Sequence, residues 1–423
     1  MKKAPQTRFS PFREEWASKR FADAFTILPN NTLSRAELSD EAGTVKNVHY
    51  GDVLIKYSEY LDAGKTDIPF IASEDLAERW RSAALQDGDV VMADTAEDTT
   101  AGKCSEIGNV RSDTIVSGLH TIPLHPQPKF SEGYLGYYMN SDAFHDQLIP
   151  LMQGTKVTSI SKSYLADTEL RFPRDSAEQA QISRLLYSLD QMITFQQRKC
   201  EKLVALKAAC LDKMFPKKGS KVPELRFAGF AGEWEQHKVA DHCEMFNGDR
   251  SAKYPNAQDM VSEGIPFINA GDLVDGHVNL ATANKITREK YDDLGGAKLQ
   301  YGDIVYCLRG TLGKNAYIEN FTEGTVASSL VAIRPKNIDG RYLFHVLNSD
   351  IEYRQRVVHD EGAAQPNLSA KSVSEYIIPV PDVDEQRSIS SFLDNLNSLI
   401  ILHQRKLEKL RQFKQAMMHN MFV

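Results

Sequence analysis

The sequence predicts an α+β fold in which one unit occurs twice, each unit being a globular domain followed by a long helix. Three observations predict it. Residues 197–203 read QRKCEKL and residues 404–410 read QRKLEKL. Residues 178–215 and 385–422 are identical at 17 of 38 aligned positions. Both of these longer stretches lack proline and glycine and have a helical period, which indicates that a whole helix is duplicated.

The duplication extends through the rest of the chain. Matching segments recur at offsets that drift from 207 to 218 residues, as insertions in surface loops would cause. Because several separate segments support one alignment, we predict a pseudo-twofold internal repeat. The aligned pairs are YLGYYMNSD (134–142) with YLFHVLNSD (342–350), LQDGDVVMAD (85–94) with LQYGDIVYCL (299–308), and RFSPFREEW (8–16) with RFAGFAGEW (226–234).

The globular parts contain short β-rich runs such as GDVLIKY, GDIVYCL and SSLVAIRP, separated by turn residues and short helical stretches, which is typical of compact α+β domains. Proline supports the boundaries, since Pro173, Pro379 and Pro381 precede the helices and Pro216 ends the first one. The predicted divisions are a first domain (1–172), a first spacer helix (173–218), a second domain (219–381) and a second spacer helix (382–423).

Each helix carries an apolar stripe with alternating steps of four and three residues, which is the signature of a coiled-coil seam. Polar residues interrupt the stripe at matching places, Gln196 with His403 and Lys207 with Lys414. We expect the helices to pack on each other antiparallel, with one domain at each end; the alternative is that each packs only on its own domain. The apolar seam residues include Ile182, Leu186, Leu189, Ile193 and Leu203 in the first helix, and Ile389, Leu393, Leu396, Ile400, Leu407 and Leu410 in the second.

Composition indicates an ordinary globular protein. Its content is 42% hydrophobic and 25% charged, and the sequence contains no apolar run of membrane-spanning length. The five cysteines are scattered without a C-x-x-C pair, so we predict neither disulfides nor a zinc site, and a cytoplasmic location. The formal net charge is −7, yet residues 178–218 sum to +4 and residues 385–423 to +3, so the globular domains are acidic. A single large basic surface for nucleic acid is therefore unlikely to dominate binding.

Motifs for catalysis are missing. The AGKTD stretch at 63–67 has Glu59 where a phosphate-binding loop needs its first glycine. No lysine stands two residues after a carboxylate, as a PD-(D/E)-x-K nuclease requires, and no Asn/Asp-Pro-Pro-aromatic loop of an amino-methyltransferase is present. No nucleophile-elbow motif supports a Ser-His-Asp triad. We therefore predict no catalytic residue, no bound metal and no cofactor.

Binding remains, and five loops mix Arg or Lys with amide, hydroxyl and glycine residues, the combination that contacts base edges and phosphates. They are residues 92–106 and 152–163 in the first domain, and 246–254, 307–317 and 362–372 in the second. For any one loop, a solvated turn explains the composition equally well. The candidate DNA-binding residues are Lys103, Lys156, Ser161, Lys162, Asn247, Arg250, Lys253, Arg309, Thr311, Lys314, Gln365 and Asn367.

The order domain, helix, domain, helix resembles the specificity (S) subunits of type I restriction–modification enzymes, the HsdS-like proteins. The resemblance spans essentially the whole chain. It is closest in residues 365–422, where QPNLS, IIPVP, an EQ pair, the long helix and a terminal MF follow in order. The first copy departs from this pattern, since KVTSISKS replaces QPNLS and RFPRDSAEQ carries one extra residue before its EQ pair.

The resemblance implies a non-catalytic subunit of a phage-defence restriction system. Each domain would be a target recognition domain that reads one half of a bipartite, asymmetric double-stranded DNA sequence, and the helices would set the spacing. The implied partners are two methyltransferase (M) subunits, which bind S-adenosylmethionine and flip the target adenine, and restriction/translocase (R) subunits. A coiled-coil scaffold protein without a DNA role, and an unrecognised nuclease or methylase, remain as alternatives.

Overall fold

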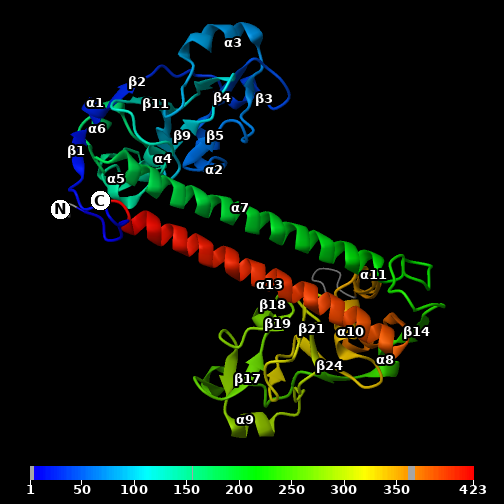
Figure 1. The fold of residues 1–423 in the computed structure, drawn as a ribbon. Coiled ribbons are helices and arrows are strands. Elements are labelled where there is room, and N and C mark those ends of the chain that lie inside the picture. The colour runs from blue at the N-terminus through cyan, green and yellow to red at the C-terminus, as the bar shows by residue number, and fades with distance from the viewer. Residues whose placement is uncertain (1–3, 155, 361–366) are drawn as a thin grey trace. The chain divides into compact units, whose positions relative to one another are not determined.

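The computed structural model describes residues 4–154, 156–360 and 367–423. The chain forms two compact units (Figure 1). Unit 1 consists of residues 1–198 and 404–423, and unit 2 of residues 199–403. Two 38-residue helices, α7 (Ser176–Lys213) and α13 (Val383–Asn420), each contribute one part to each unit. Both helices lie inside the ranges that the sequence predicts as helical.

Unit 1 is an α+β domain built on two sheets. The larger has the order β2-β11-β7-β9-β5, in which only β5 and β9 run parallel. Its strands are β2 (Phe25–Ile27), β11 (Thr121–Pro126), β7 (Val90–Ala93), β9 (Cys104–Gly108) and β5 (Tyr60–Asp62). The smaller has the order β10-β4-β6-β3, formed by β10 (Thr114–Ser117), β4 (Val45–Val48), β6 (Phe70–Ile71) and β3 (Leu38–Ser39).

The globular part of unit 1, without the long helices, is called its head. Within the described residues, two ribbons and six short α-helices complete this head. The ribbons pair β1 (Ala17–Arg20) with β13 (Glu169–Phe172), and β8 (Thr95–Ala96) with β12 (Thr158–Ser159). The helices are α1 (Phe21–Ala24), α2 (Tyr50–Ile55), α3 (Glu74–Trp80), α4 (Tyr134–Met139), α5 (Asp142–His145) and α6 (Lys162–Leu165). Every residue of α4 is buried, which makes this helix the centre of the packing against α7.

Unit 2 repeats this plan. Its first sheet has the order β15-β24-β21-β22, with β15 (Cys243–Asn247), β24 (Leu330–Pro335), β21 (Ile304–Cys307) and β22 (Asn315–Tyr317). Its second has the order β16-β20-β17-β23, with β16 (Met260–Val261), β20 (Asn284–Ile286), β17 (Ile265–Ile268) and β23 (Thr325–Val326). Read from its other end, this second order matches that of the small sheet of unit 1, and each contains one parallel pair, β10·β4 and β23·β17.

The remaining elements of unit 2 correspond to those of unit 1 only in part. A ribbon pairs β14 (Glu235–Lys238) with β25 (Ile377–Val380), as β1 pairs with β13, and a hairpin joins β18 (Leu273–Val274) to β19 (His277–Val278). The helices are α8 (Val239–His242), α9 (Arg288–Asp293), α10 (Gly340–Val346), α11 (Asp350–His359) and α12 (Ala370–Ser374). The duplication read from the sequence is therefore a duplication of the main sheet topology, with differences in the fifth strand and the small ribbons.

A buried ion pair ties the beginning of each long helix to an arm that precedes the head. In unit 1, Arg8 Nε and Nη2 donate to the two carboxylate oxygens of Glu178 at 2.6 and 2.8 Å. In unit 2, Arg226 makes the same bidentate contact with Glu385 at 2.7 and 2.8 Å. Both carboxylates lie in the first turn of their helix, where the helix dipole also stabilises a negative charge.

The predicted seam residues are buried or half-buried along both helices. Ile182, Leu186 and Leu189 belong to the core of unit 1, onto which Leu410 also packs. In contrast, Phe195, outside the stripe, is 63% exposed. The corresponding stripe residues of α13 enter the core of unit 2, onto which Leu203 packs; they are Ile389, Leu393 and Leu396.

Within unit 1, the end of α13 runs antiparallel to the beginning of α7. Lys414 Nζ lies 2.6 Å from Asp190 Oδ1, and Arg411 Nη2 donates to Gln197 Oε1 at 3.4 Å. The earlier residue of α13 thus meets the later residue of α7. The helix beginnings also pack on their own heads, so the alternative expectation from the sequence describes part of the arrangement.

All five cysteines are free and buried. Within the described residues, no helix is both long enough and apolar enough to cross a membrane.

Candidate nucleic-acid interface

In unit 2, two of the predicted DNA-binding loops converge on one backbone segment, residues 327–330. Arg250 Nη2 donates to Ser328 O at 3.2 Å, and Leu308 N donates to Ser329 O at 2.9 Å. The loops follow β15 and β21, which flank β24 in the first sheet. Neighbouring strands therefore bring together loops that lie about 60 residues apart in the chain.

The third loop of unit 2 joins them through an Arg–Asn contact. Arg309 Nε donates to Asn367 Oδ1 at 3.1 Å, and the backbones of the two residues form an isolated antiparallel bridge. Arg309 and Thr311 are exposed. A guanidinium has five N–H donors, so this contact leaves donors for a phosphate or a base edge. Gln365, the remaining candidate in this loop, lies outside the described residues.

Asn247, Arg250 and Lys253 line a hollow of about 680 Å³. Its shape depends on Asp249, whose carboxylate accepts two backbone N–H groups, from residues 251 and 295, at 2.6 and 2.8 Å. The hydrogen bonds from residue 251 lower the pKa of Asp249, so it is ionised at neutral pH. Lys253 is ion-paired with Asp293 at the edge of the hollow. Of the three predicted DNA ligands on this hollow, Lys253 therefore already has an anionic partner.

Lys314 has a structural partner. Its Nζ donates to Ala270 O at 2.9 Å, and the side chain is half-buried. The ammonium thus joins the loop that follows β21 to the short turn before β18. We assign Lys314 a role in positioning this loop, because a backbone carbonyl holds its ammonium, where the sequence alone predicted contact with DNA.

In unit 1, the pairing of β8 with β12 places the two predicted loops, residues 92–106 and 152–163, side by side. Lys156 and Lys162 are exposed on the second loop. Ser161 caps α6, since its Oγ accepts from the backbone N–H of Tyr164 at 3.4 Å. This cap positions Lys162 at the first residue of the helix.

Lys103 differs from the other unit 1 candidates. Its Nζ donates to Leu54 O at 2.7 Å, at the end of α2, and burial lowers the pKa of the lysine. The ammonium therefore holds α2 against the sheet. We assign Lys103 a structural role, since a half-buried amine that is bonded to a carbonyl is poorly available to a phosphate.

One exposed side chain of unit 1 was not among the candidates predicted from the sequence. His120 has φ +51° in the turn before β11, is about half exposed, and its Nδ1 lies 3.4 Å from Asp94 Oδ1. Its position relative to β11 corresponds to that of Ser329 relative to β24, where the loops of unit 2 converge. The internal repeat was the signal that could have identified it.

The predicted loops share one kind of chemistry. Their side chains supply guanidinium, amide and hydroxyl groups. Among the residues that the structure describes, no cluster of three or more His, Cys, Asp or Glu side chains could hold a metal ion.

Comparison with known proteins defines the class. Residues 231–412 match the family model described as the type I restriction modification DNA specificity domain. The chain is 21% identical over 282 residues to the MjaVIII specificity subunit of Methanocaldococcus jannaschii, a match that covers 63% of this chain and 64% of that subunit, slightly less than two thirds of its length. It is also 21% identical over 437 residues to the putative MjaX specificity subunit of the same organism, covering 98% of this chain and 94% of that subunit.

Solved structures share the fold over nearly the whole chain. The S subunit of a type I restriction–modification system from M. genitalium has a TM-score of 0.59 at 14% identity and covers 99% of both chains. A chain from a study of complex assembly and conformational transition of the type I R-M system has a TM-score of 0.55 at 18% identity, covering 96% of this chain and 98% of that one. Residues 231–412 therefore resemble a DNA specificity domain, and the fold is that of solved type I S subunits. Over nearly its whole length the chain is similar to a putative type I restriction enzyme specificity subunit.

Proposed function

We propose that this chain is the non-catalytic DNA-specificity subunit of a type I restriction–modification enzyme, and that each unit reads one half of a bipartite, asymmetric target. The observation that carries the proposal is the duplicated topology with divergent loops. The sheets and the Arg–Glu clamps repeat, whereas the loops that follow the strands differ in sequence and charge. Two copies of one scaffold with different reading loops suit two different half-sites.

The proposed reading surface of unit 2 is formed by Arg309, Asn367, Arg250, Asn247 and Thr311. Arg paired with Asn can contact guanine and adenine edges in the major groove. In unit 1 the corresponding surface is formed by Lys156, Ser161, Lys162 and His120. Because the chain carries a net charge of −7, partner subunits would supply part of the positive field around DNA.

The long helices would form an antiparallel coiled coil that sets the distance between the two half-sites. Each helix has 38 residues, which corresponds to about 57 Å at 1.5 Å per residue. Two observations support the pairing: the Lys414–Asp190 contact in unit 1, and the presence of Cys210 of α7 and Leu393 of α13 in one core of unit 2.

An exposed apolar trio on the helices is itself duplicated, which supports two copies of one partner. In unit 1, α7 contributes two exposed apolar residues that lie three positions apart, and α13 contributes a third. In unit 2 the roles of the two helices are reversed. Corresponding members have closely similar exposures, and each pair is separated by 207 residues in sequence. Conserving exposed apolar side chains in both copies suits a docking surface. The pairs are Met192 (48%) with Leu399 (43%), Phe195 (63%) with Leu402 (60%), and Leu206 (47%) with Phe413 (48%).

The proposed partners are two methyltransferase subunits, which bind S-adenosylmethionine and flip the target adenine, together with restriction/translocase subunits. The first test reconstitutes the chain with the methyltransferase of its own system and maps methylated adenines on a plasmid library by long-read sequencing. One split motif with a gap of constant length is expected. Methylation or cleavage by the purified chain alone, or methylation by the methyltransferase alone at the same motif, would refute the proposal.

A further inference from the structure

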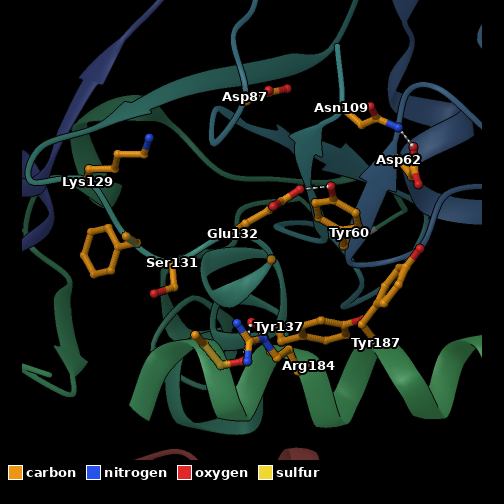
Figure 2. A pocket seen from close by; sticks show the side chains of 14 residues that line it. Tyr60, Asp62, Asp87, Asn109, Lys129, Ser131, Glu132, Tyr137, Arg184 and Tyr187 are labelled. Atoms are coloured by element: carbon orange, nitrogen blue, oxygen red, sulfur yellow. Dashed lines mark hydrogen bonds between the residues drawn. The ribbon is translucent and has the colours of Figure 1, made fainter. Parts of the chain in front are cut away.

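Unit 1 contains a cavity of about 690 Å³ between the start of α4, the β5 edge of the large sheet and the first turns of α7. Figure 2 shows that Tyr60, Tyr137 and Tyr187 form much of its wall. The rings of Tyr60 and Tyr187 stand perpendicular to each other, with centroids 5.5 Å apart. All the lining residues belong to unit 1.

Carboxylates accompany these rings. The hydroxyl of Tyr60 donates to Glu132, and Asp62 accepts from Asn109 Nδ2 at 2.7 Å (Figure 2). Asp87 adds a third carboxylate to the lining. Aromatic faces beside carboxylates form the environment in which a guanidinium is stabilised by both cation–π attraction and charge-assisted hydrogen bonds.

The internal repeat shows what occupies the same place in unit 2. The positions of the two sites can be aligned through one hydrogen bond that both units contain. The backbone N–H of Ser131 donates to Gln179 Oε1 at 2.9 Å, and that of Asp339 donates to Gln386 Oε1 at 2.9 Å. Two residues further along the chain, unit 1 has a glycine, Gly133, where unit 2 has an arginine.

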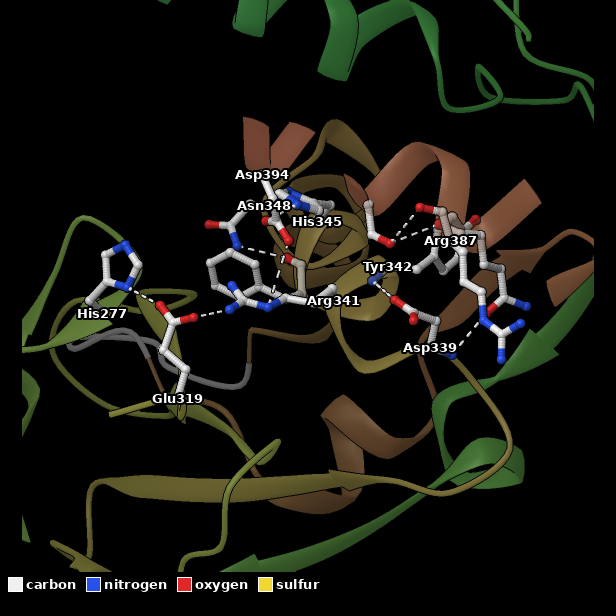
Figure 3. A network of polar contacts seen from close by, with 12 residues as sticks. His277, Glu319, Asp339, Arg341, Tyr342, His345, Asn348, Arg387 and Asp394 are labelled. Carbon is white, nitrogen blue, oxygen red and sulfur yellow. Dashed lines mark hydrogen bonds and ion pairs between the residues drawn. The ribbon is translucent and has the colours of Figure 1, made fainter. Parts of the chain in front are cut away.

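That arginine, Arg341, fills the site in unit 2 (Figure 3). Its guanidinium carbon lies 4.1 Å from the ring centroid of Tyr317. The guanidinium is ion-paired with Glu319, and its Nε is 3.6 Å from Asp394. The polar network extends further, since Asp394 also accepts a hydrogen bond from His345 Nε2 at 2.9 Å. An aromatic ring and two carboxylates thus hold one guanidinium.

We propose that the unit 1 cavity receives an arginine side chain from a partner polypeptide, at the place that Arg341 occupies in unit 2. The cavity has aromatic rings and carboxylates of its own, at positions other than those that hold Arg341 in unit 2, and has Gly133 in place of the arginine. The proposal names one contact of the partner in the proposed function and rests on that function. With one copy of the site filled by the chain itself, this contact would be made at unit 1 alone and would distinguish two otherwise equivalent partner positions.

Two cations of the chain itself, Arg184 and Lys129, also line the cavity. Arg184 comes from α7, and its counterpart 207 residues later is Ser391. The effect of Arg184 on partner affinity distinguishes two possible occupants of the cavity, an arginine and an anion. An incoming arginine would be repelled by Arg184, whereas an incoming anion such as a phosphate would require it.

Photo-crosslinking tests the contact directly. Tyr187 is replaced with p-benzoylphenylalanine in the full chain, the methyltransferase of the same system is added, and the captured peptide is sequenced after irradiation. The matched control carries the probe at Ile55, which is 89% exposed on α2 of the same unit. We expect Tyr187 to capture one arginine-containing segment of the partner that Ile55 does not capture. An intact complex without such capture, or capture of a segment that lacks arginine, overturns this proposal and leaves the proposed function standing.

Charge substitutions provide the second readout, the dissociation constant of the methyltransferase complex. Glu132→Lys should weaken the complex about tenfold, because it places a cation against the incoming guanidinium. Glu41→Lys, an equal charge change at an exposed loop of unit 1, should leave affinity within about twofold. Arg184→Ser should leave affinity unchanged or raise it. A large loss of affinity for Arg184→Ser would overturn the proposal in favour of an anion, and failure of the unsubstituted chain to bind the methyltransferase would refute the proposed function and this proposal together.

Discussion

The two units keep one kind of contact and change another. Each retains a buried Arg–Glu pair at the start of its long helix, with both carboxylates 1% exposed and both arginines 15% exposed. Each also retains a glutamine that bonds the turn before the equivalent helix, Gln179 before α4 and Gln386 before α10. The join between head and helix is therefore duplicated closely.

The sheets show where the copies diverge. Asp89 of unit 1 and Asp303 of unit 2 occupy equivalent buried positions before β7 and β21. Asp89 bonds His125 Nδ1 at 2.7 Å, whereas Asp303 forms a bidentate pair with Arg334 at 2.8 Å for both bonds. Burial raises the pKa of Asp89, because desolvation outweighs its hydrogen bonds.

The helices diverge in the same way at equivalent lysines. Lys414 lies in unit 1 between Asp190 and Glu59, at 2.6 and 2.8 Å. Burial alone would lower its pKa, but these two carboxylates outweigh burial and raise it. Lys207 lies in unit 2, where burial lowers its pKa despite attraction from Asp275 and Asp394. Duplication thus preserved the framework and left its charges free to change.

Removing the buried Arg–Glu pair at the start of either long helix should have the largest effect on stability. Glu178→Ala should lower the free energy of unfolding by about 3 kcal/mol, because it leaves Arg8 without its buried partner. Glu385→Ala should cost about 4 kcal/mol, since Glu385 also accepts from Trp234 Nε1 at 3.1 Å. Urea denaturation of the full chain measures both. Losses below 1 kcal/mol in either copy would show that the clamp does not hold the helix to its arm.

Removing the side-chain partners of Asp303 and Asp89 should lower stability by unequal amounts. Arg334→Ala should destabilise the protein by about 3 kcal/mol, because it breaks two charge-assisted bonds to buried Asp303 and a third to Lys298 O. His125→Ala should cost about 1 kcal/mol, since a single bond is lost from a partly exposed ring. Thermal denaturation of the two variants gives the comparison. Equal losses would contradict the inferred difference between the pairs.

Replacing Lys414 and replacing Lys207 should change stability differently. Lys414→Met should destabilise by about 2 kcal/mol by leaving Asp190 and Glu59 unpaired. Lys207→Met should be neutral or stabilise by up to about 1 kcal/mol at pH 7, because it removes a poorly compensated buried charge. Urea unfolding at pH 7 measures both changes, and destabilisation by Lys207→Met equal to that by Lys414→Met would contradict the account.

Their pH dependence follows from the same shifts. The folded pKa of Lys207 is depressed, so the unfolded state binds more protons above that pKa, and this group's contribution to stability rises with pH up to the unfolded value. The folded pKa of Lys414 is raised, so its contribution is present below the unfolded value and is lost as pH rises through the folded one. Unfolding curves of each variant against the unsubstituted chain between about pH 8 and 11 should show these opposite slopes.

Substitutions on the reading loops should change DNA binding. In the reconstituted complex, Arg309→Ala should weaken DNA binding by about 1 to 3 kcal/mol and relax specificity only in the half-site read by unit 2. Lys314→Ala should change specificity less, because a backbone carbonyl holds its ammonium. Binding assays on DNA with single-base changes in each half-site measure both. Relaxation in both half-sites by Arg309→Ala would contradict one-unit, one-half-site reading.

The repeat and the seam could be predicted because they are periodic in the sequence, as Leu186 and Leu393 illustrate. The contacts within the candidate interface could be predicted only in part. Its loops were identifiable from composition, but the contact of Arg309 with Asn367 joins residues 58 positions apart and depends on strand order. Likewise, nothing in the sequence distinguishes Lys103, whose ammonium holds α2, from exposed Lys156. Local pattern predicts elements; which charges are already satisfied is decided by tertiary packing.

The central claim is that each unit reads one half of a split DNA target. The most direct measurement exchanges residues 1–150 for the corresponding segment of a related subunit and maps the methylated motif by long-read sequencing. The claim predicts that one half of the motif changes while the other half and the gap between them stay the same. An unchanged motif, or a change in both halves, would contradict it.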